Sequence, residues 1–207
     1  MLFARPLALA LVFAACSSAA APDTTAAILE PDPSNSTALS NQGGALEGHT
    51  PRGFAGMGTG LFAGDNLNPN FPDGDGVQIY LTFEAESLVG VSSAVLSSDA
   101  LTVRGAPFED LGTLFAEPVV YEVFGAALFD LAPIGPAASC ERVGNSGIAC
   151  DVTDSVRSAF DAGETRFQFR LRFEQAGDGD GRADLAMFFV TESNTNQPGI
   201  FTLTLTG

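Results

Sequence analysis

The sequence predicts an all-β fold, an antiparallel β-sandwich of the jelly-roll type with one short amphipathic helix. Many short stretches alternate between apolar and polar residues, and Gly, Pro, Asn and Asp separate them. Only one stretch has helical periodicity instead. Short strands with turn residues between them are typical of antiparallel sandwiches. The 17 phenylalanines and the absence of tryptophan indicate a core filled by phenyl rings.

Alternation is clearest in residues 77–86, VQIYLTFEAE, where Ile79, Leu81 and Phe83 share one face of the expected strand. The chain after residue 50 has the length of one domain, which we place at residues 51–207. Further strands are expected at 91–98, 100–105, 118–124, 126–131, 166–173, 185–190 and 200–206.

The helical exception runs from Asp151 to Gly163. Asp151 or Thr153 can cap its first turn, and Gly163 can take the left-handed conformation that ends a helix. Its apolar stripe consists of Val152, Val156, Ala159 and Phe160. Because so short a helix cannot stand alone, we expect it to lie across one end of the sandwich.

The first 15 residues have the layout of an export signal peptide, with Arg5 followed by a short apolar run. The stretch VFAAC at 12–16 resembles the bacterial lipobox, which predicts a lipid on Cys16 as the protein's only attachment to a membrane. Ser17 resembles the following residue of lipoproteins sent to the outer membrane. The alternative is ordinary cleavage near Ala20, which would discard Cys16. Either route places the protein in the cell envelope or outside the cell.

Residues 16–50 are rich in Ala, Ser, Pro, Asn, Thr and Gly and lack hydrophobic periodicity. We interpret them as a flexible tether, which at this length spans roughly 30 Å. The alternative is a leader without a role.

Two cysteines remain once Cys16 is set aside. Exported proteins oxidise such pairs, so we expect a disulfide between Cys140 and Cys150, with a stabilisation of roughly 3 kcal/mol. The alternative is a metal or redox pair, which is disfavoured because no histidine lies nearby and the spacing is not C-x-x-C.

The net charge is strongly negative. The chain has 25 acidic residues against 9 basic ones, all of them arginine, and a formal charge of −16. Loss of residues 1–15 removes only Arg5 and leaves −17. This balance argues against a nucleic-acid partner, since nucleic-acid binding needs a basic surface.

Three stretches resemble, in the same order, DNRLRE-type domains, which are jelly-roll modules related to alginate-binding carbohydrate-binding modules. They are IYLTFEAESLVGVSSAVLSSDALTV at 79–103, GIACDVTDSVRSAFDAGETRFQFRLRF at 147–173 and AMFFVTESNTNQPGIFTLTLTG at 186–207. The resemblance implies a jelly-roll fold and a carbohydrate ligand.

An acidic loop, AGDGDGRADLAMFF at 176–189, carries Asp178, Asp180 and Asp184 at spacing D-x-D-G-x-x-D. Three carboxylates on a tight loop can converge on Ca²⁺, which prefers oxygen ligands. The alternative is a plain turn between two strands. A second loop with Asp73 and Asp75 is shorter and reads as a turn.

Arginines recur in the strand RFQFRLRF at 166–173. Its apolar residues should face the core, so Arg166, Gln168, Arg170 and Arg172 should face solvent. Guanidinium groups pair well with carboxylates, which predicts an acidic polysaccharide ligand, with Tyr80 as a stacking surface. The alternative is cross-strand pairing of these arginines with Glu84, Glu86 or Glu122.

No catalytic constellation can be proposed, so we do not expect an enzyme. The only histidine, His49, lies in the expected tether without a fixed partner. The sequence leaves two functions: a polysaccharide-binding module with structural calcium, or a structural or adhesive protein that engages other envelope proteins and has no glycan ligand.

Overall fold

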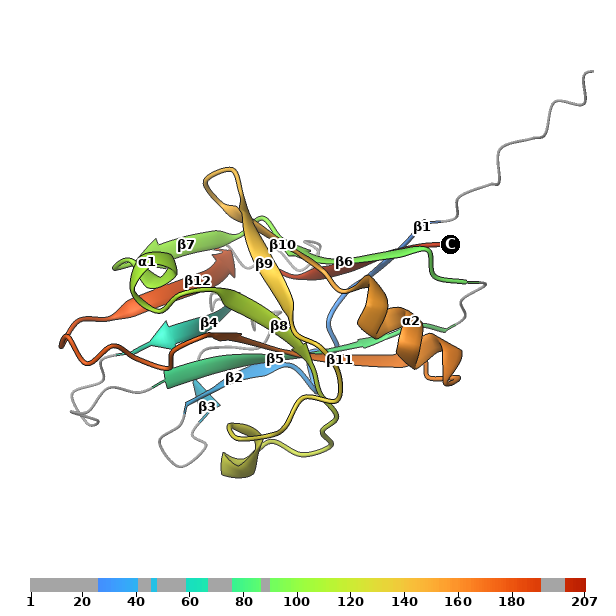
Figure 1. Ribbon diagram of the computed structural model, residues 1–207, viewed down its shortest axis with the longest axis horizontal. Helices are drawn as coiled ribbons and strands as arrows, with labels where there is room; N and C mark the ends of the chain where they lie inside the picture. The colour runs from blue at the N-terminus through green and yellow to red at the C-terminus, as the bar shows by residue number, and fades with distance from the viewer. Residues whose placement is uncertain (1–25, 41–45, 48–58, 67–75, 87–89, 191–199) are drawn as a thin grey trace, which may run out of the picture.

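The computed structural model describes residues 26–40, 46–47, 59–66, 76–86, 90–190 and 200–207 (Figure 1). The predictions on the signal peptide, Cys16, His49 and the loop with Asp73 and Asp75 therefore lie outside the described residues. Within the described part of the chain, no helix is both long and apolar enough to cross a bilayer.

The described elements are mostly strands. The strands are β1 (Ala26–Leu29), β2 (Thr37–Ser40), β3 (Leu46–Glu47), β4 (Thr59–Asp65), β5 (Gly76–Glu84), β6 (Ser93–Ser98), β7 (Leu101–Arg104), β8 (Leu114–Pro118), β9 (Ala138–Val143), β10 (Gly147–Asp151), β11 (Arg166–Phe173), β12 (Asp184–Val190) and β13 (Thr202–Thr206). The helices are α1 (Pro107–Asp110), a single 3₁₀ turn (Ala126–Leu128) and α2 (Thr153–Asp161).

These strands form one antiparallel sheet in the order β1-β13-β6-β10-β9-β8-β11-β5-β4-β12-β7, while β2 pairs with β5 and β3. The sheet curls so that its two halves face each other (Figure 1). The prediction of an antiparallel all-β fold with a short amphipathic helix is confirmed. A two-sheet sandwich is not, because β8 and β9 pair at Phe115–Ser139 and Ala116–Ala138 and so join the halves.

The core lies between the two halves of the curled sheet. Leu81, Phe83 and Phe169 are among its fully or almost fully buried side chains. The rings of Phe188 and Phe201 lie 4.8 Å apart. Phe188 belongs to β12, and Phe201 directly precedes β13, which lies in the opposite half of the sheet. Contacts of this kind confirm the prediction of a core rich in phenyl rings.

The predicted helix is α2, and it closes one end of the curled sheet between β10 and β11 (Figure 1). Val152 and Val156 enter the core. The carboxylate of Asp151 accepts hydrogen bonds from the Thr153 N–H at 3.0 Å and the Thr153 hydroxyl at 2.6 Å, which lower the pKa of Asp151. Gly163, with φ of +83°, ends the helix as predicted.

The predicted disulfide is present. Cys140 and Cys150 stand directly opposite each other in the β9–β10 pair and are bonded. The bond therefore fastens the hairpin that carries the chain into α2.

The expected tether is wrong for residues 26–40, because they belong to the sheet. β1 pairs with β13, and β2 pairs with β5. Leu39 is fully buried, and the backbone N–H of Thr82 donates to the hydroxyl of Ser36 at 3.0 Å. The described fold therefore includes strands upstream of residue 51, where the domain was expected to begin.

The strands predicted at 118–124 and 126–131 are also wrong. After β8 ends at Pro118, the chain leaves the sheet and runs irregularly, with the single 3₁₀ turn, over the outer face of β5 and β11 (Figure 1). Apolar residues that would have alternated along a strand instead form a second small core. Its buried members are Leu39, Tyr80, Val119, Tyr121 and Leu128.

Candidate functional site

The predicted arginine ladder does not face solvent as a whole. The irregular segment after β8 covers the middle of the ladder, so Gln168 and Arg170 are buried, with 7% and 4% of their surface exposed. Arg172 and Arg166 keep about a third of their side-chain surface exposed. The four side chains do lie on the face opposite the main core, but the prediction that this face is open to solvent is wrong for the two in the middle of the strand.

Glu117 of β8 holds two of the arginines. Its Oε2 accepts a hydrogen bond from Nε of Arg170 at 2.8 Å, and its Oε1 accepts one from Nε of Arg172 at 3.0 Å. Arg170 also donates to the backbone carbonyl of Phe129 at 3.1 Å. One buried carboxylate thus serves two guanidinium groups, and the group Arg170–Glu117–Arg172 has one surplus positive charge.

The charge state of this group is fixed by its contacts. Burial raises the pKa of Glu117, but hydrogen bonds from Arg172 and Arg170 outweigh burial and leave that pKa below its ordinary value. Glu117 therefore stays ionised at neutral pH. The outcome matches the alternative of cross-strand pairing, although the partner of Arg170 and Arg172 is Glu117 and not a predicted glutamate. Glu84 does lie opposite Arg166, at 3.9 Å.

Tyr80 is fully buried, so it cannot stack on a sugar ring as predicted. Its hydroxyl hydrogen-bonds to the side chain of Gln78 at 2.8 Å and to the carbonyl of Leu128 at 2.7 Å. Burial raises the pKa of Tyr80 to about 12, and the nearby Arg170 offsets only part of that effect. Tyr80 is thus a neutral structural residue that fastens the irregular segment to β5. Arg170, buried under the same segment, is likewise withdrawn from direct ligand contact.

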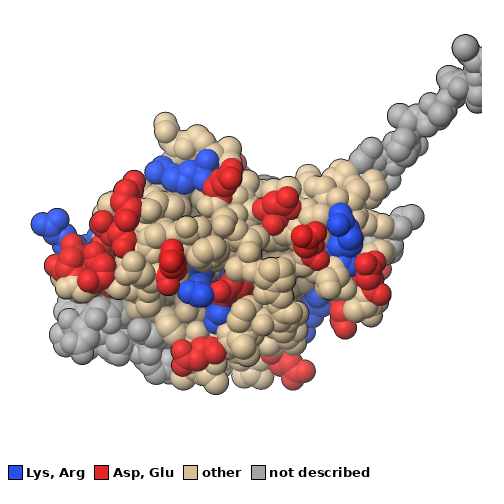
Figure 2. Space-filling view, viewed as in Figure 1, with Lys and Arg blue, Asp and Glu red and all other residues tan. Residues whose placement is uncertain are grey.

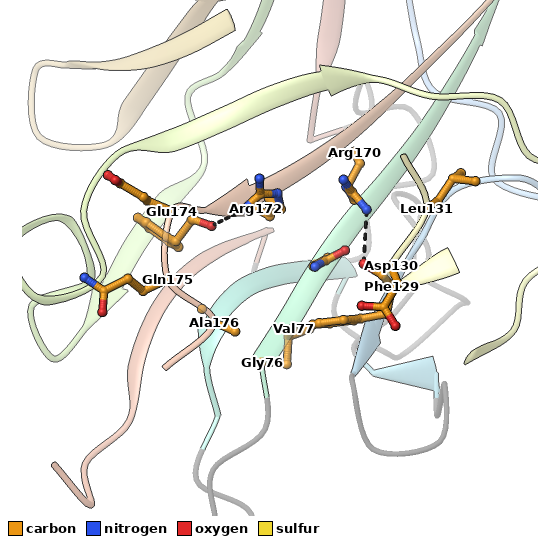
Figure 3. A pocket seen from close by; sticks show the side chains of 13 residues that line it. Gly76, Val77, Phe129, Asp130, Leu131, Arg170, Arg172, Glu174, Gln175 and Ala176 are labelled. Atoms are coloured by element: carbon orange, nitrogen blue, oxygen red, sulfur yellow. Dashed lines mark hydrogen bonds between the residues drawn. The ribbon is translucent and has the colours of Figure 1, made fainter. Parts of the chain in front are cut away.

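A cleft of about 270 Å³ opens beside the buried arginine group (Figure 3). Figure 3 shows Glu174 and Gln175, which follow β11, on one side of the cleft and Phe129 and Asp130 on the other. The remaining lining residues are Gly64, Gly76, Val77, Gln78, Leu131, Arg170, Arg172, Phe173 and Ala176. Two of the predicted ligand residues therefore line this cleft, and of these Arg172 keeps about a third of its side chain exposed while Arg170 is buried. The Arg172 guanidinium group also donates to the carbonyl of Phe173 at 3.1 Å.

A larger groove of about 590 Å³ lies between α2 and the chain after β8. Arg166 lines it, as do Val120 and Ile134, which are 61% and 67% exposed. Glu122, Asp154 and Glu164 are also part of its wall. Compared with the cleft beside Arg172, this groove therefore exposes more apolar side chains and carries more acidic residues in its wall.

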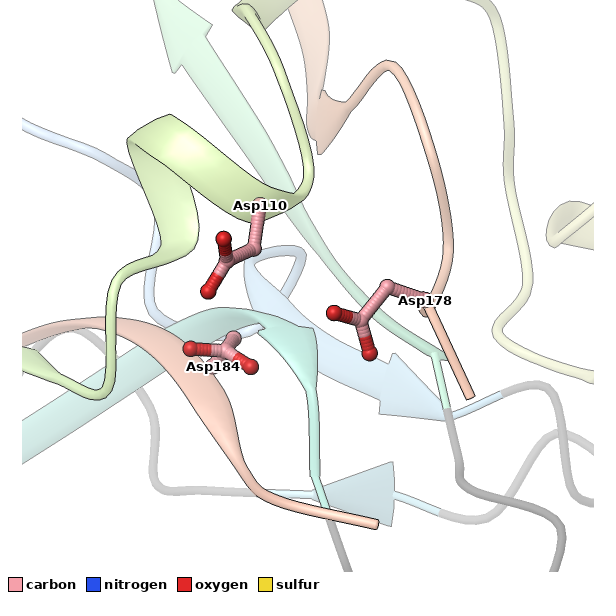
Figure 4. A group of neighbouring side chains, drawn as sticks. All are labelled: Asp110, Asp178 and Asp184. Carbon is pink, nitrogen blue, oxygen red and sulfur yellow. The ribbon is translucent and has the colours of Figure 1, made fainter. Parts of the chain in front are cut away.

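The predicted calcium loop is only partly assembled as expected. Asp178 and Asp184 meet, but the third carboxylate is Asp110 of α1 and not Asp180 (Figure 4). Asp180 instead accepts a hydrogen bond from the backbone N–H of Arg182 at 2.7 Å and lies 3.9 Å from its guanidinium group. Acidic side chains gather at the end of the molecule that carries α1 and the β11–β12 loop (Figure 2).

No protein-family model matches the chain, and a search of curated proteins gives no match. The resemblance to DNRLRE-type domains therefore stays a prediction.

Proposed function

We propose that the chain is a non-catalytic binding protein of the bacterial cell envelope, and that its cleft beside Arg172 binds an acidic polysaccharide. The observation that carries the proposal is the surplus positive charge of the Arg170–Glu117–Arg172 group at the wall of this cleft. Export and a lipid on Cys16 at the outer membrane belong to the same proposal and rest on the first 17 residues of the sequence.

The groups at the cleft suit a sugar that carries a carboxylate. Arg172 presents about a third of its side chain, and a guanidinium group matches a carboxylate in shape and charge. Gln175 supplies an exposed amide that can hydrogen-bond to hydroxyl groups, and the half-buried ring of Phe129 supplies an apolar surface. Gln78 lies in the cleft wall, but it is buried and its Oε1 already accepts from the Tyr80 hydroxyl. At about 270 Å³ the cleft is near the lower limit for ligand pockets, which suits one sugar unit of a longer chain.

Charge around the cleft narrows the class of polysaccharide. Asp130 and Glu174 lie exposed at its edges, and the chain as a whole is strongly acidic. A densely sulfated polymer would meet this negative field along its whole length, whereas a uronate presents single carboxylates that Arg172 can bind at short range. We therefore favour a polyuronate over a polysulfate.

The first prediction is that Arg172→Gln weakens binding of a uronate oligomer at least about tenfold, which corresponds to loss of roughly 1.4 kcal/mol of a charge-assisted contact. Isothermal titration calorimetry measures the affinity. Arg104→Gln is the matched control, because Arg104 is exposed on β7 and lies outside the cleft. Equal affinity of wild type and Arg172→Gln, with both variants folded, would place the ligand elsewhere.

A second function, contact with another envelope protein, is favoured by the apolar rim of the larger groove. Single exposed apolar residues are ordinary, but Val120 and Ile134 line the same groove. Under this function the protein binds no uronate oligomer, and Val120→Asp abolishes its crosslinking to an envelope neighbour in intact cells. Crosslinking that survives in Val120→Asp would remove this groove from consideration.

A further inference from the structure

Three carboxylates from three separate elements converge at the acidic end of the molecule. Asp110 is the last residue of α1, Asp178 lies in the loop after β11, and Asp184 is the first residue of β12. One oxygen of each lies within 4.8 Å of the others. Ca²⁺ binds oxygen at about 2.3 to 2.6 Å, so two ligands on opposite sides of one ion are about 5 Å apart. The three oxygens can therefore belong to a single coordination shell.

Asp184 gives independent evidence of a ligand. Its side chain faces the other two carboxylates (Figure 4), and the residue is only 2% exposed. Oδ1 accepts a hydrogen bond from the backbone N–H of Ala106 at 2.6 Å, but the buried Oδ2 has no hydrogen-bond partner among the described residues. A buried carboxylate oxygen without a partner is costly, and a cation supplies the missing interaction.

No arginine side chain of the described residues supplies the positive charge that these carboxylates lack. Within the described part of the chain, no arginine forms an ion pair with Asp110, Asp178 or Asp184. Repulsion among the carboxylates is thus uncompensated by the protein's own side chains.

The backbone at Gly105 fixes the position of the Asp184 carboxylate. Gly105, with φ of +72°, brings the backbone against the Asp184 carboxylate so closely that a Cβ there would lie 2.1 Å from Oδ1. Any side chain at position 105 would therefore displace the carboxylate. Oδ1 is thereby held against the Ala106 N–H, whereas Oδ2 is buried without a hydrogen-bond partner in the described part of the chain.

We propose that Asp110, Asp178 and Asp184 form a binding site for a divalent cation, with Ca²⁺ as the ion. An all-oxygen set of carboxylates suits a hard cation, and ligands on a loop and a short helix suit the flexible geometry of Ca²⁺ better than the strict octahedron of Mg²⁺. Water and backbone carbonyls complete the shell, as in other calcium sites. The site differs from the contiguous loop predicted from the sequence, because Asp110 replaces Asp180.

The cation would fasten α1 to the β11–β12 loop. That loop begins at Glu174 and Gln175, whose backbone N–H groups donate to the carbonyls of Thr113 at 2.9 Å and Leu111 at 3.1 Å. Glu174 and Gln175 also line the cleft beside Arg172. Cation binding thus stabilises the folded state and supports one wall of the cleft, although the site itself does not depend on any polysaccharide.

The test uses the full chain with Cys16→Ser, freed of metal with a chelator and then titrated with CaCl₂ in a thermal melt and by calorimetry. Wild type is expected to bind one Ca²⁺ and to melt several degrees higher at millimolar Ca²⁺, since a ligand of the folded state raises the melting temperature. Asp184→Asn and Asp110→Asn are each expected to weaken Ca²⁺ binding at least tenfold.

Asp180→Asn is the matched control, because its amide oxygen can still accept from the Arg182 N–H. It is expected to bind Ca²⁺ as wild type does. The proposal is overturned if wild type shows no calcium shift, or if Asp180→Asn loses binding while Asp110→Asn keeps it. Asp110 is exposed, so Asp110→Asn should fold even if Asp184→Asn does not. Calcium binding without uronate binding would overturn only the function proposed above.

Discussion

Replacing Glu117 with alanine is expected to destabilise the domain by about 3 to 5 kcal/mol, the cost of leaving a buried charge without its partner. Glu117 and Arg170 are each only 4% exposed at the side chain, and Glu117 is the only carboxylate that pairs with Arg170 in the described part of the chain. The carbonyl of Phe129 would remain as a hydrogen-bond acceptor but carries no charge. Urea unfolding of Glu117→Ala and wild type measures the difference.

Glu84→Ala is the control for this prediction. Glu84 is exposed and lies 3.9 Å from Arg166, so its removal should change stability by no more than about 1 kcal/mol. Similar small effects of Glu84→Ala and Glu117→Ala would show that Arg170 does not need its buried partner.

The same pair predicts a dependence on pH. The pKa of Glu117 is lowered in the folded state from an ordinary value of about 4.5, so the folded state binds the proton less tightly than the unfolded chain. The stabilisation from ionised Glu117 is complete above the ordinary value and is lost as pH falls through the lower folded value. The stability difference between wild type and Glu117→Gln should therefore shrink in acid. A difference that grows as pH falls would contradict this assignment.

Deleting residues 1–45 is expected to destabilise the domain by more than about 4 kcal/mol, enough to unfold a marginally stable domain. The deletion removes Leu39, whose burial contributes about 1.5 to 3 kcal/mol, and exposes the residues that pack on it. It also removes the Ser36 hydroxyl, the acceptor for the buried N–H of Thr82, at a cost of about 1 to 3 kcal/mol. Finally, β13 loses its partner β1.

A chain that begins at residue 26 is the matched control, since it keeps every described strand. Circular dichroism and a thermal melt should find it folded, and the chain that begins at residue 46 unfolded or much less stable. Equal melting temperatures of the two chains would restore the tether proposed from the sequence.

Sequence periodicity predicted the elements whose pattern is long and local. Apolar and polar residues alternate along β5 and β11, and an apolar stripe runs along α2. These patterns are long enough that the sequence alone identifies the three elements. By contrast, β1 and β2 have only four residues each and owe their structure to distant partners. The chain after Pro118 has strand-like residues, but they pack into the second core instead of pairing.

The candidate site was predictable to a similar degree. Strand alternation placed Arg170 and Arg172 correctly on the face opposite the core, but it could not show that another segment covers that face. The D-x-D-G-x-x-D spacing of the loop identified Asp178 and Asp184 as candidate calcium ligands. Asp110 could not be found in that way, because α1 comes from a remote part of the chain and reaches the loop only through folding. One feature of the sequence could have indicated a paired Glu117: it is the single acidic residue in the otherwise apolar strand β8.

The most direct measurement is a solution NMR titration of the protein with a uronate oligomer, monitored at the side-chain amide resonances of Gln78 and Gln175. Both residues line the cleft beside Arg172. We expect saturable shifts of these two resonances, which Arg172→Gln removes and Arg104→Gln preserves. Saturable binding that leaves both amides unmoved, or no binding at any oligomer concentration, would contradict the assignment of this cleft to an acidic polysaccharide.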